Sequence, residues 1–294
     1  MSERGRGVLF ALIAYGAWGI NPIYFKLVTY ATPMEVLVHR VVWSLALLLV
    51  VVAIRRLWQP LVAILRSPRQ LAVLFVTGVL VAGNWLVFIW ALQNSRMVEA
   101  SLGYYINPLV TVLLGVVFLG ERLRGALVVA LALACAGVVN EVIAFGGLPV
   151  VSLSLAVSFG VYGLVRKTIG VDSVLGLTVE TALLAPFAVA YGSSLVETGA
   201  LAFGRVDPAR SLGLMAAGIV TTIPLVAFGA ATLRLPLWVL GFLQYFSPSI
   251  TLLLALFVYG EPFAPSRAIT FALIWSALAI FSTAELVRAR RQLA

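Results

Sequence analysis

Three ionisable side chains lie inside long apolar runs of the sequence. His39 and Arg40 fall about six residues into the run 34–54, and Glu180 lies about a third of the way into the run 174–192. A charged group surrounded by so much apolar sequence is costly unless it faces a cavity or a partner. Arg40 therefore either binds an anionic group or extends its long side chain to a polar interface. Glu180 is a candidate proton or cation site, or half of a structural pair. His39 is either a proton carrier or a satisfied interfacial histidine.

Two polar faces occur in the middle of later apolar runs. Side chains at i, i+3 and i+7 share one face of a helix, and this spacing holds for the sets Tyr104, Asn107, Thr111 and Gln244, Ser247, Thr251. Facing each other at mid-depth, they would form a solute site. The alternative is hydrogen bonding between helices without a ligand. Pro108 and Pro248 remove one backbone hydrogen bond from each run, and with Pro22 they are the candidate hinges.

Aromatic and amide side chains elsewhere are weaker candidates for a cavity lining. Trp18 and Asn84 are favoured because they lie near the middle of their runs, although aromatic residues in such runs more often pack or face lipid. The sequence has no nucleophile motif, phosphate-binding loop or metal-ligand cluster. We therefore expect no catalytic residues, no metal and no cofactor, and predict that the protein is not an enzyme. Cys135 is the single cysteine, so no disulfide framework is expected.

Composition places this chain in a lipid environment. Of its 294 residues, 62% are hydrophobic and 11% are charged, whereas soluble domains are roughly 45–50% apolar and about 25% charged. The net charge of +9 comes from basic residues scattered mostly at the ends of apolar runs. That distribution suits orientation in a membrane and argues against a nucleic-acid partner.

Ten apolar runs approach the length of about 20 residues that a helix needs to span a bilayer. Helices are the expected element because lipid satisfies no backbone hydrogen bonds. The first run is predicted to be a retained helix rather than a cleaved signal peptide. The predicted spans are 7–28, 34–54, 71–92, 98–119, 125–144, 148–167, 174–192, 212–232, 237–259 and 267–286.

Basic residues between the runs predict the orientation. With a cytoplasmic N-terminus, 14 of the 20 Lys and Arg residues, including Arg166 and Lys167, fall on the cytoplasmic side and 5 outside, and Arg40 lies within a helix. This bias predicts a multi-pass protein of a bacterial-type inner membrane with both termini in the cytoplasm.

The two halves of the chain repeat each other at an offset of 140 residues. Tyr105, Pro108 and Thr111 then align with Tyr245, Pro248 and Thr251, and Gly120-Glu121 aligns with Gly260-Glu261. The third and fourth spans thus recur as the eighth and ninth, which implies five spans per repeat. Because five is odd, the second repeat, 148–287, is inverted relative to the first, 7–144. Inverted repeats suit alternating access.

Short segments along nearly the whole chain carry a resemblance to a known family. They are Ala14–Gly19, Pro22–Lys26, His39–Ser44, Gly83–Ala91, Glu99–Leu109, Leu119–Arg122, Tyr162–Lys167, Glu180-Thr181, Gly218–Thr222, Gly241-Phe242 and Gln244-Tyr245. In these segments the chain resembles RarD-type members of the EamA family in the drug/metabolite transporter superfamily. The resemblance implies ten helices in two inverted five-helix repeats around a central cavity, and export or exchange of small metabolites or drugs. A chloramphenicol-related phenotype is attached to the family name.

The sequence therefore predicts an all-α membrane protein acting as a secondary transporter of small solutes, as a monomer or homodimer, with protons as a candidate coupling ion. A passive channel or facilitator, or a membrane partner protein that transports nothing, is the alternative. His39 and Glu180 are the proton-coupling candidates. The expected substrate-binding residues are Trp18, Arg40, Asn84, Tyr104, Asn107, Glu180, Gln244 and Tyr245.

Overall fold

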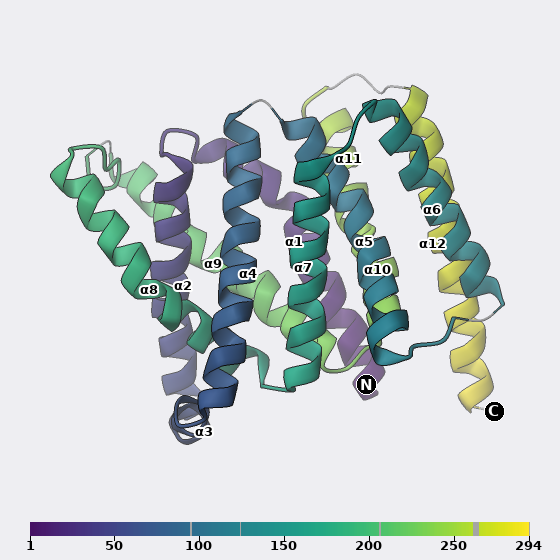
Figure 1. Cartoon of the computed structure of the whole chain (residues 1–294), viewed down its shortest axis with the longest axis horizontal. Helices are drawn as coiled ribbons and strands as arrows, with labels where there is room; N and C mark the ends of the chain where they lie inside the picture. The colour runs from purple at the N-terminus through teal and green to yellow at the C-terminus, as the bar shows by residue number, and fades with distance from the viewer. Residues whose placement is uncertain (95, 124, 206, 261–264, 294) are drawn as a thin grey trace.

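Helices make up the computed structural model, which describes residues 1–94, 96–123, 125–205, 207–260 and 265–293 (Figure 1). No strand occurs within these ranges. The helices are α1 Glu3–Leu27, α2 Pro33–Ile54, α3 Trp58–Leu65, α4 Pro68–Gln93, α5 Met97–Leu119, α6 Ala126–Phe145, α7 Val150–Ile169, α8 Ser173–Glu197, α9 Pro208–Thr232, α10 Leu237–Gln244, α11 Phe246–Phe257 and α12 Pro265–Leu293.

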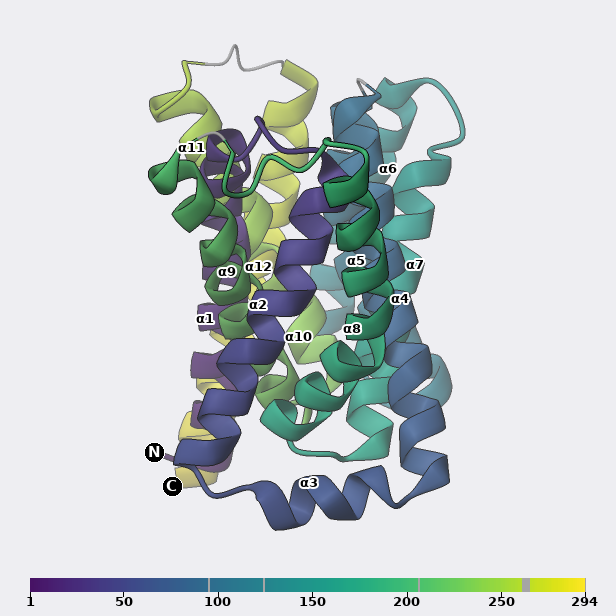
Figure 2. The ribbon, with the colours of Figure 1, turned by 90° about the vertical axis from the view of Figure 1, so that its left-hand side faces the viewer.

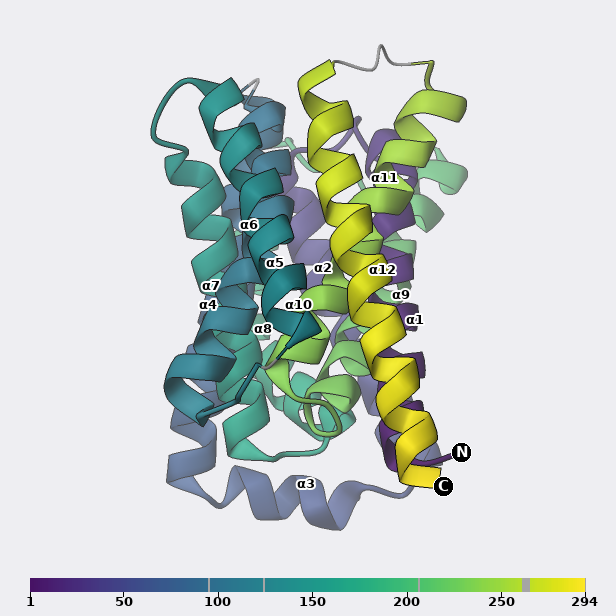
Figure 3. The ribbon, with the colours of Figure 1, turned by 90° about the vertical axis from the view of Figure 1, so that its right-hand side faces the viewer.

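The described residues include ten helical segments long and apolar enough to cross a membrane, which confirms the expected all-α class and the ten spans. Their bounds differ from the predicted runs by a few residues, because polar N-caps extend several helices past the apolar sequence. Asp207, for example, caps α9 by accepting a hydrogen bond from the backbone N–H of Arg210 (2.7 Å). Both chain ends lie at the same end of the bundle (Figure 3), as an even number of spans requires.

The short helix α3 was not predicted from the sequence. It connects α2 to α4 and lies across the end of the bundle near the chain termini, roughly perpendicular to the spans (Figure 2). Leu61 and Ile64 on one side are buried against the core, while Val62 and Leu65 are exposed. A helix of eight residues is too short to span, and it is apolar on its exposed side as well as on its buried side, with Trp58 48% exposed. Its place across the end of the bundle suits a segment at the membrane interface.

The ninth span, predicted as one helix, is interrupted. It consists of α10 and α11, with the helix broken at Tyr245, three residues before Pro248. Proline cannot donate a backbone hydrogen bond and its ring crowds the preceding turn, which accounts for a break at this point. Pro22 and Pro108 lie inside the continuous helices α1 and α5. The hinge roles of all three prolines stay predictions.

The packing of the helices is paired between the two halves. If α1, α2, α4 and α5 correspond to α7, α8, α9 and α10–α11, the contact of α1 with α9 has its counterpart in α7 with α4. The contact of α2 with α9 likewise matches α8 with α4, and α1 with α11 matches α7 with α5. Helices α6 and α12 pair with each other at one edge (Figure 3). Two related halves would produce this pattern.

Two glycines allow the central helices to approach closely. A Cβ on Gly218 of α9 would lie 2.6 Å from the backbone of Trp43 in α2. A Cβ on Gly241 of α10 would lie 2.6 Å from the Val112 side chain and 2.7 Å from the Pro108 carbonyl oxygen in α5. Small residues at such crossings let membrane helices pack backbone to backbone. The crossings fix the positions of α2, α5, α9 and α10 around the interior of the bundle.

Candidate functional site

Arg40 is buried between four helices. Its side chain projects from α2, is 5% exposed, and donates a hydrogen bond from Nε to the Thr221 hydroxyl of α9 (2.9 Å). The guanidinium carbon lies 4.1 Å from the ring centroid of Trp85 on α4 and 5.5 Å from that of Phe25 on α1. Aromatic faces stabilise a cation by their quadrupole. Among the described residues, no carboxylate forms an ion pair with this guanidinium.

Tyr104 of α5 is the partly exposed neighbour of Arg40. It is 42% exposed, its ring contacts Phe88 at 5.8 Å, and its phenol lies close enough to Arg40 to interact electrostatically. The Arg40 side chain points into the bundle, where it is bonded to α9, rather than toward an interface. Whether it binds a solute there stays a prediction.

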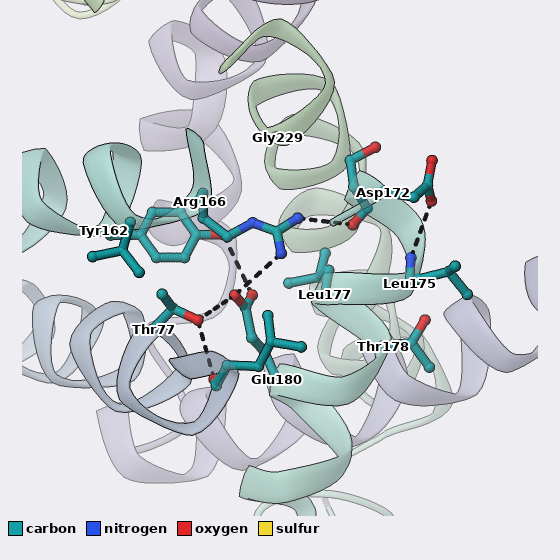
Figure 4. Close-up of polar contacts among 12 residues, drawn as sticks. Thr77, Tyr162, Arg166, Asp172, Leu175, Leu177, Thr178, Glu180 and Gly229 are labelled. Carbon is teal, nitrogen blue, oxygen red and sulfur yellow. Dashed lines mark hydrogen bonds and ion pairs between the residues drawn. The ribbon is translucent and has the colours of Figure 1, made fainter. Parts of the chain in front are cut away.

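A second buried charge cluster surrounds Glu180 (Figure 4). The carboxylate, completely buried on α8, accepts hydrogen bonds from the Thr77 hydroxyl (2.6 Å) and the Tyr162 phenol (3.4 Å). Its Oε1 also lies 3.6 Å from Nη1 of Arg166. Thr77 belongs to α4, and Tyr162 and Arg166 belong to α7. The cluster therefore joins three helices through one ion pair.

Arg166 was missed as a site residue, because it lies at the end of the predicted span 148–167 and was counted with the basic residues of the cytoplasmic side. It lies in the last turn of α7, but it is only 2% exposed. Its guanidinium lies against Gly176 of α8, where a Cβ would be only 1.7 Å from Nη1. A third contact runs from Nη2 to the Ser173 carbonyl oxygen at 3.4 Å. The requirement that a buried Glu180 have a counter-charge is the signal that would have identified Arg166.

Aromatic rings fill the space between these two charged regions. Trp18 packs 5.2 Å from Phe159 and 5.7 Å from Phe228, and Tyr162 stacks on Phe228 at 6.0 Å. On α9, Thr221 bonds to Arg40, and Phe228 follows seven residues later. Gly229, the residue after Phe228, borders Arg166. Seven residues of helix correspond to about 10 Å. The aromatic layer therefore separates Arg40 from the Glu180 pair.

The polar faces of the fourth and ninth spans meet, and their side chains form hydrogen bonds with each other and with backbone groups. The Thr111 hydroxyl lies 3.2 Å from Asn107 Oδ1 and 3.5 Å from Gln244 Oε1. The phenol of Tyr245 donates to the Tyr105 carbonyl oxygen (3.3 Å), so two tyrosines related by the 140-residue offset touch. All but Tyr105 are largely buried. The expectation that Gln244 and Thr251 share a face fails, because the helix breaks between them and Thr251 bonds to α1 instead.

Asn84 and His39 also have partners inside the protein. The Asn84 amide donates to the Leu155 carbonyl oxygen (2.8 Å) and the Ser158 hydroxyl (2.9 Å), linking α4 to α7. His39 Nδ1 accepts a hydrogen bond from the Trp43 indole (2.9 Å), and its Nε2 lies 3.9 Å from Glu35. These contacts leave the functional predictions for both residues untested.

Glu35 is a buried carboxylate that the sequence analysis did not single out. It accepts backbone hydrogen bonds from Ala202 (2.8 Å) and Phe203 (2.9 Å), which ties the connection between α8 and α9 to α2. Glu121 likewise accepts backbone hydrogen bonds, from Leu237 (2.8 Å) and Trp238 (3.0 Å) at the start of α10. Its repeat counterpart Glu261 lies outside the described residues.

Known proteins resemble this chain along almost its whole length. A transporter of Vibrio cholerae described as uncharacterized is 50% identical over 277 residues, covering 94% of this chain and 92% of that protein. Protein RarD of Escherichia coli is 46% identical and covers 97% of each chain. The model of the EamA-like transporter family matches residues 5–140. The chain belongs to the EamA-like transporter family, as a RarD-type member.

More distant relatives of this EamA protein agree in fold and extent. A Pseudomonas aeruginosa protein named chloramphenicol-sensitive protein RarD is 34% identical and covers 98% of each chain. A solved crystal structure with 22% identity superposes with a TM-score of 0.72, covering 98% of this chain and 99% of that one. That structure supports the ten-span fold. The family and the ten apolar helices together establish a multi-pass bacterial membrane protein of the transporter class.

Proposed function

We propose that this EamA protein is a secondary transporter that exports or exchanges small solutes with an anionic group by alternating access. Arg40 carries the proposal. A guanidinium inside the bundle, held by one hydroxyl and two rings, lacks a carboxylate partner in the described structure and lies near the partly exposed Tyr104. An intramembrane charge of this kind is a functional site by default. Amino-acid-like metabolites are the candidate solutes that carry such an anionic group. Drugs such as chloramphenicol, which is uncharged, are candidates that would bind to the hydrogen-bond donors and aromatic rings of the same site.

The remaining expected residues are assigned around Arg40 in this proposal. Tyr104 and Trp18 line the path of the solute. Asn84, Asn107, Gln244 and Tyr245 hold the helices that form it, since their polar groups bond to neighbouring helices. The halves 7–144 and 148–287 are inverted repeats that rock about the site, with Pro22, Pro108 and Pro248 as hinges. The paired packing of the helices supports this assignment.

Proton coupling is assigned to Glu180, with His39 as the second candidate. A carboxylate that bonds to three helices through Thr77, Tyr162 and Arg166 can change those contacts when it takes up a proton. The protein is placed in the inner membrane with both termini cytoplasmic, on the basis of the basic-residue bias. An acid-driven flux that persists unchanged in Glu180→Gln would remove Glu180 from this role.

The proposal is tested by comparing metabolite uptake into inside-out vesicles with and without the protein, using a cell extract as the source of solutes. We expect compounds with a carboxylate to accumulate against their gradient. Flux that only follows the gradient would indicate a passive facilitator, and no difference in any compound would refute transport.

The role of Arg40 is tested with the accumulated compound at matched protein abundance. Arg40→Lys retains the charge but loses the planar fork of donors, so we expect about a tenfold or greater loss of uptake, the effect of one charge-assisted hydrogen bond. Arg40→Gln should lose nearly all uptake. Full activity of Arg40→Lys would show that the guanidinium does not bind the solute.

A further inference from the structure

A pocket of about 440 Å³ lies at the end of the bundle where the chain begins. Four cationic side chains line it: Arg4 from α1, Arg122 from the connection between α5 and α6, Lys167 from the last turn of α7, and Arg234 from the connection between α9 and α10. The single carboxylate in the lining is Glu121. The lining thus has an excess of three positive charges.

The acidic groups near the pocket are already engaged. Both oxygens of Glu121 accept backbone hydrogen bonds at the start of α10. Glu3, which is not part of the lining, pairs with Arg234 at 3.1 Å and with Arg6 at 2.9 Å. The Lys167 ammonium is held in place by the carbonyl oxygens of Thr232 (3.1 Å) and Leu235 (2.6 Å). These carbonyl contacts position the ammonium at the pocket without neutralising its charge.

Arg122 differs from the other cations because it is exposed and makes no hydrogen bond or ion pair within the described structure. Its guanidinium is therefore available to an incoming anion. Planar guanidinium groups match the oxygens of a phosphate group with two parallel hydrogen bonds, and three of the four cations are arginines.

We propose that this pocket binds a phosphate group, at a site separate from Arg40. The two sites share no residue. Two of its cations belong to the first half of the chain and two to the second. A bound phosphate therefore bridges the halves and stabilises the arrangement in which these four segments converge. The phosphate belongs either to an anionic phospholipid headgroup, which basic pockets between membrane helices recognise, or to a soluble phosphate compound.

The test uses the purified full-length protein in neutral detergent with inorganic phosphate as the probe. Thermal unfolding is followed at constant ionic strength maintained with chloride. We expect a saturable rise of the midpoint with phosphate concentration. Arg122→Gln should weaken the apparent phosphate affinity about tenfold, since one charge-assisted interaction is lost, and Arg122→Glu should abolish the rise.

The matched control is Arg66→Gln, which removes an exposed cation outside the pocket, at the end of α3. Its phosphate response should equal that of the wild type. An equal loss in Arg66→Gln and Arg122→Gln would reduce the effect to general charge screening and overturn the proposal. Because neither side chain forms a hydrogen bond or ion pair in the described structure, we expect both variants to fold as the wild type does.

A second arm identifies the source of the phosphate. The protein is placed in nanodiscs of phosphatidylcholine with or without phosphatidylglycerol. If phosphatidylglycerol raises the midpoint of the wild type but not of Arg122→Glu, a lipid headgroup occupies the pocket. If inorganic phosphate acts and phosphatidylglycerol does not, the ligand is soluble. The absence of a saturable rise with either probe overturns the site.

Discussion

Removal of either partner of the buried Glu180–Arg166 pair should have unequal consequences. The charged atoms are 3.6 Å apart, and with an effective dielectric constant of about 20 their attraction is about 5 kcal/mol before desolvation is subtracted. In Glu180→Gln the guanidinium remains charged, since arginine does not lose its proton in proteins, and its remaining hydrogen bond to Ser173 is long at 3.4 Å. We expect a loss of about 3–5 kcal/mol in the free energy of unfolding.

Arg166→Met should cost less. The carboxyl group that remains can take up a proton and become neutral, and it keeps its hydrogen bond to Thr77 (2.6 Å). We expect about 1–3 kcal/mol. The double variant should be less destabilised than the sum of the two single variants, by about 1–3 kcal/mol, because no unpaired charge is then left in the core.

The assay is equilibrium unfolding in mixed micelles titrated with sodium dodecyl sulfate and followed by circular dichroism. The control cycle uses the exposed pair Asp207 and Arg210, 3.3 Å apart with side chains 43% and 51% exposed, changed to Asn and Gln. Its coupling should be about 0–1 kcal/mol. Additive losses at Glu180 and Arg166, or a greater loss in Arg166→Met than in Glu180→Gln, would refute the reasoning.

Three further predictions concern access, packing and orientation. In a Cys135→Ala background, Tyr104→Cys should react with a small water-soluble thiol reagent, whereas the control Leu48→Cys, at a completely buried position, should not. If neither cysteine reacts, water does not reach position 104. Gly241→Ala should destabilise the protein by about 1–3 kcal/mol because its methyl group meets backbone, whereas Gly83→Ala, with nothing within 4 Å, should be neutral or stabilising by up to about 1 kcal/mol. A C-terminal reporter active only in the periplasm should remain inactive, and activity would contradict cytoplasmic termini.

The spans could be predicted from the sequence because lipid leaves the backbone few options. A run of about 20 apolar residues in a bilayer must be a helix, and hydropathy reports this directly. Helix α3 could not be predicted because its eight residues include both buried and exposed apolar positions. A loop at an interface can contain the same pattern. The break at Tyr245 could not be predicted from Pro248, because Pro108, which aligns with Pro248 at the 140-residue offset, leaves α5 continuous.

The partners of the polar residues could not be predicted in the same way. Asn84 was favoured because it lies near the middle of its apolar run, yet its amide bonds to Leu155 and Ser158 of α7. A polar residue at such a position can face a cavity or bond to a neighbouring helix. Which of the two occurs depends on which helices are neighbours, and hydropathy contains no information about neighbours. Arg166 shows the same limit, because its inward direction depends on the absence of a side chain at Gly176 of another helix.

If the two halves are inverted repeats, as proposed, the charges do not follow the repeat. Arg40 and Glu180 each lie seven residues after the first residue of their helices, α2 and α8, and are 140 residues apart. At the same offset Arg166 corresponds to Lys26, and Gly176 corresponds to Val36.

This difference determines which buried charge has a partner. In the second half, Gly176 leaves room for the guanidinium of Arg166 to reach Glu180, so that pair is balanced inside the protein. In the first half, the equivalent position carries the buried side chain of Val36, and Lys26 is exposed with its ammonium 3.2 Å from the Tyr259 ring. A cation turned toward Arg40 would in any case repel it. Arg40 is therefore left in the described bundle as a buried cation without a carboxylate partner, which is the basis for the proposal that an anionic solute balances it.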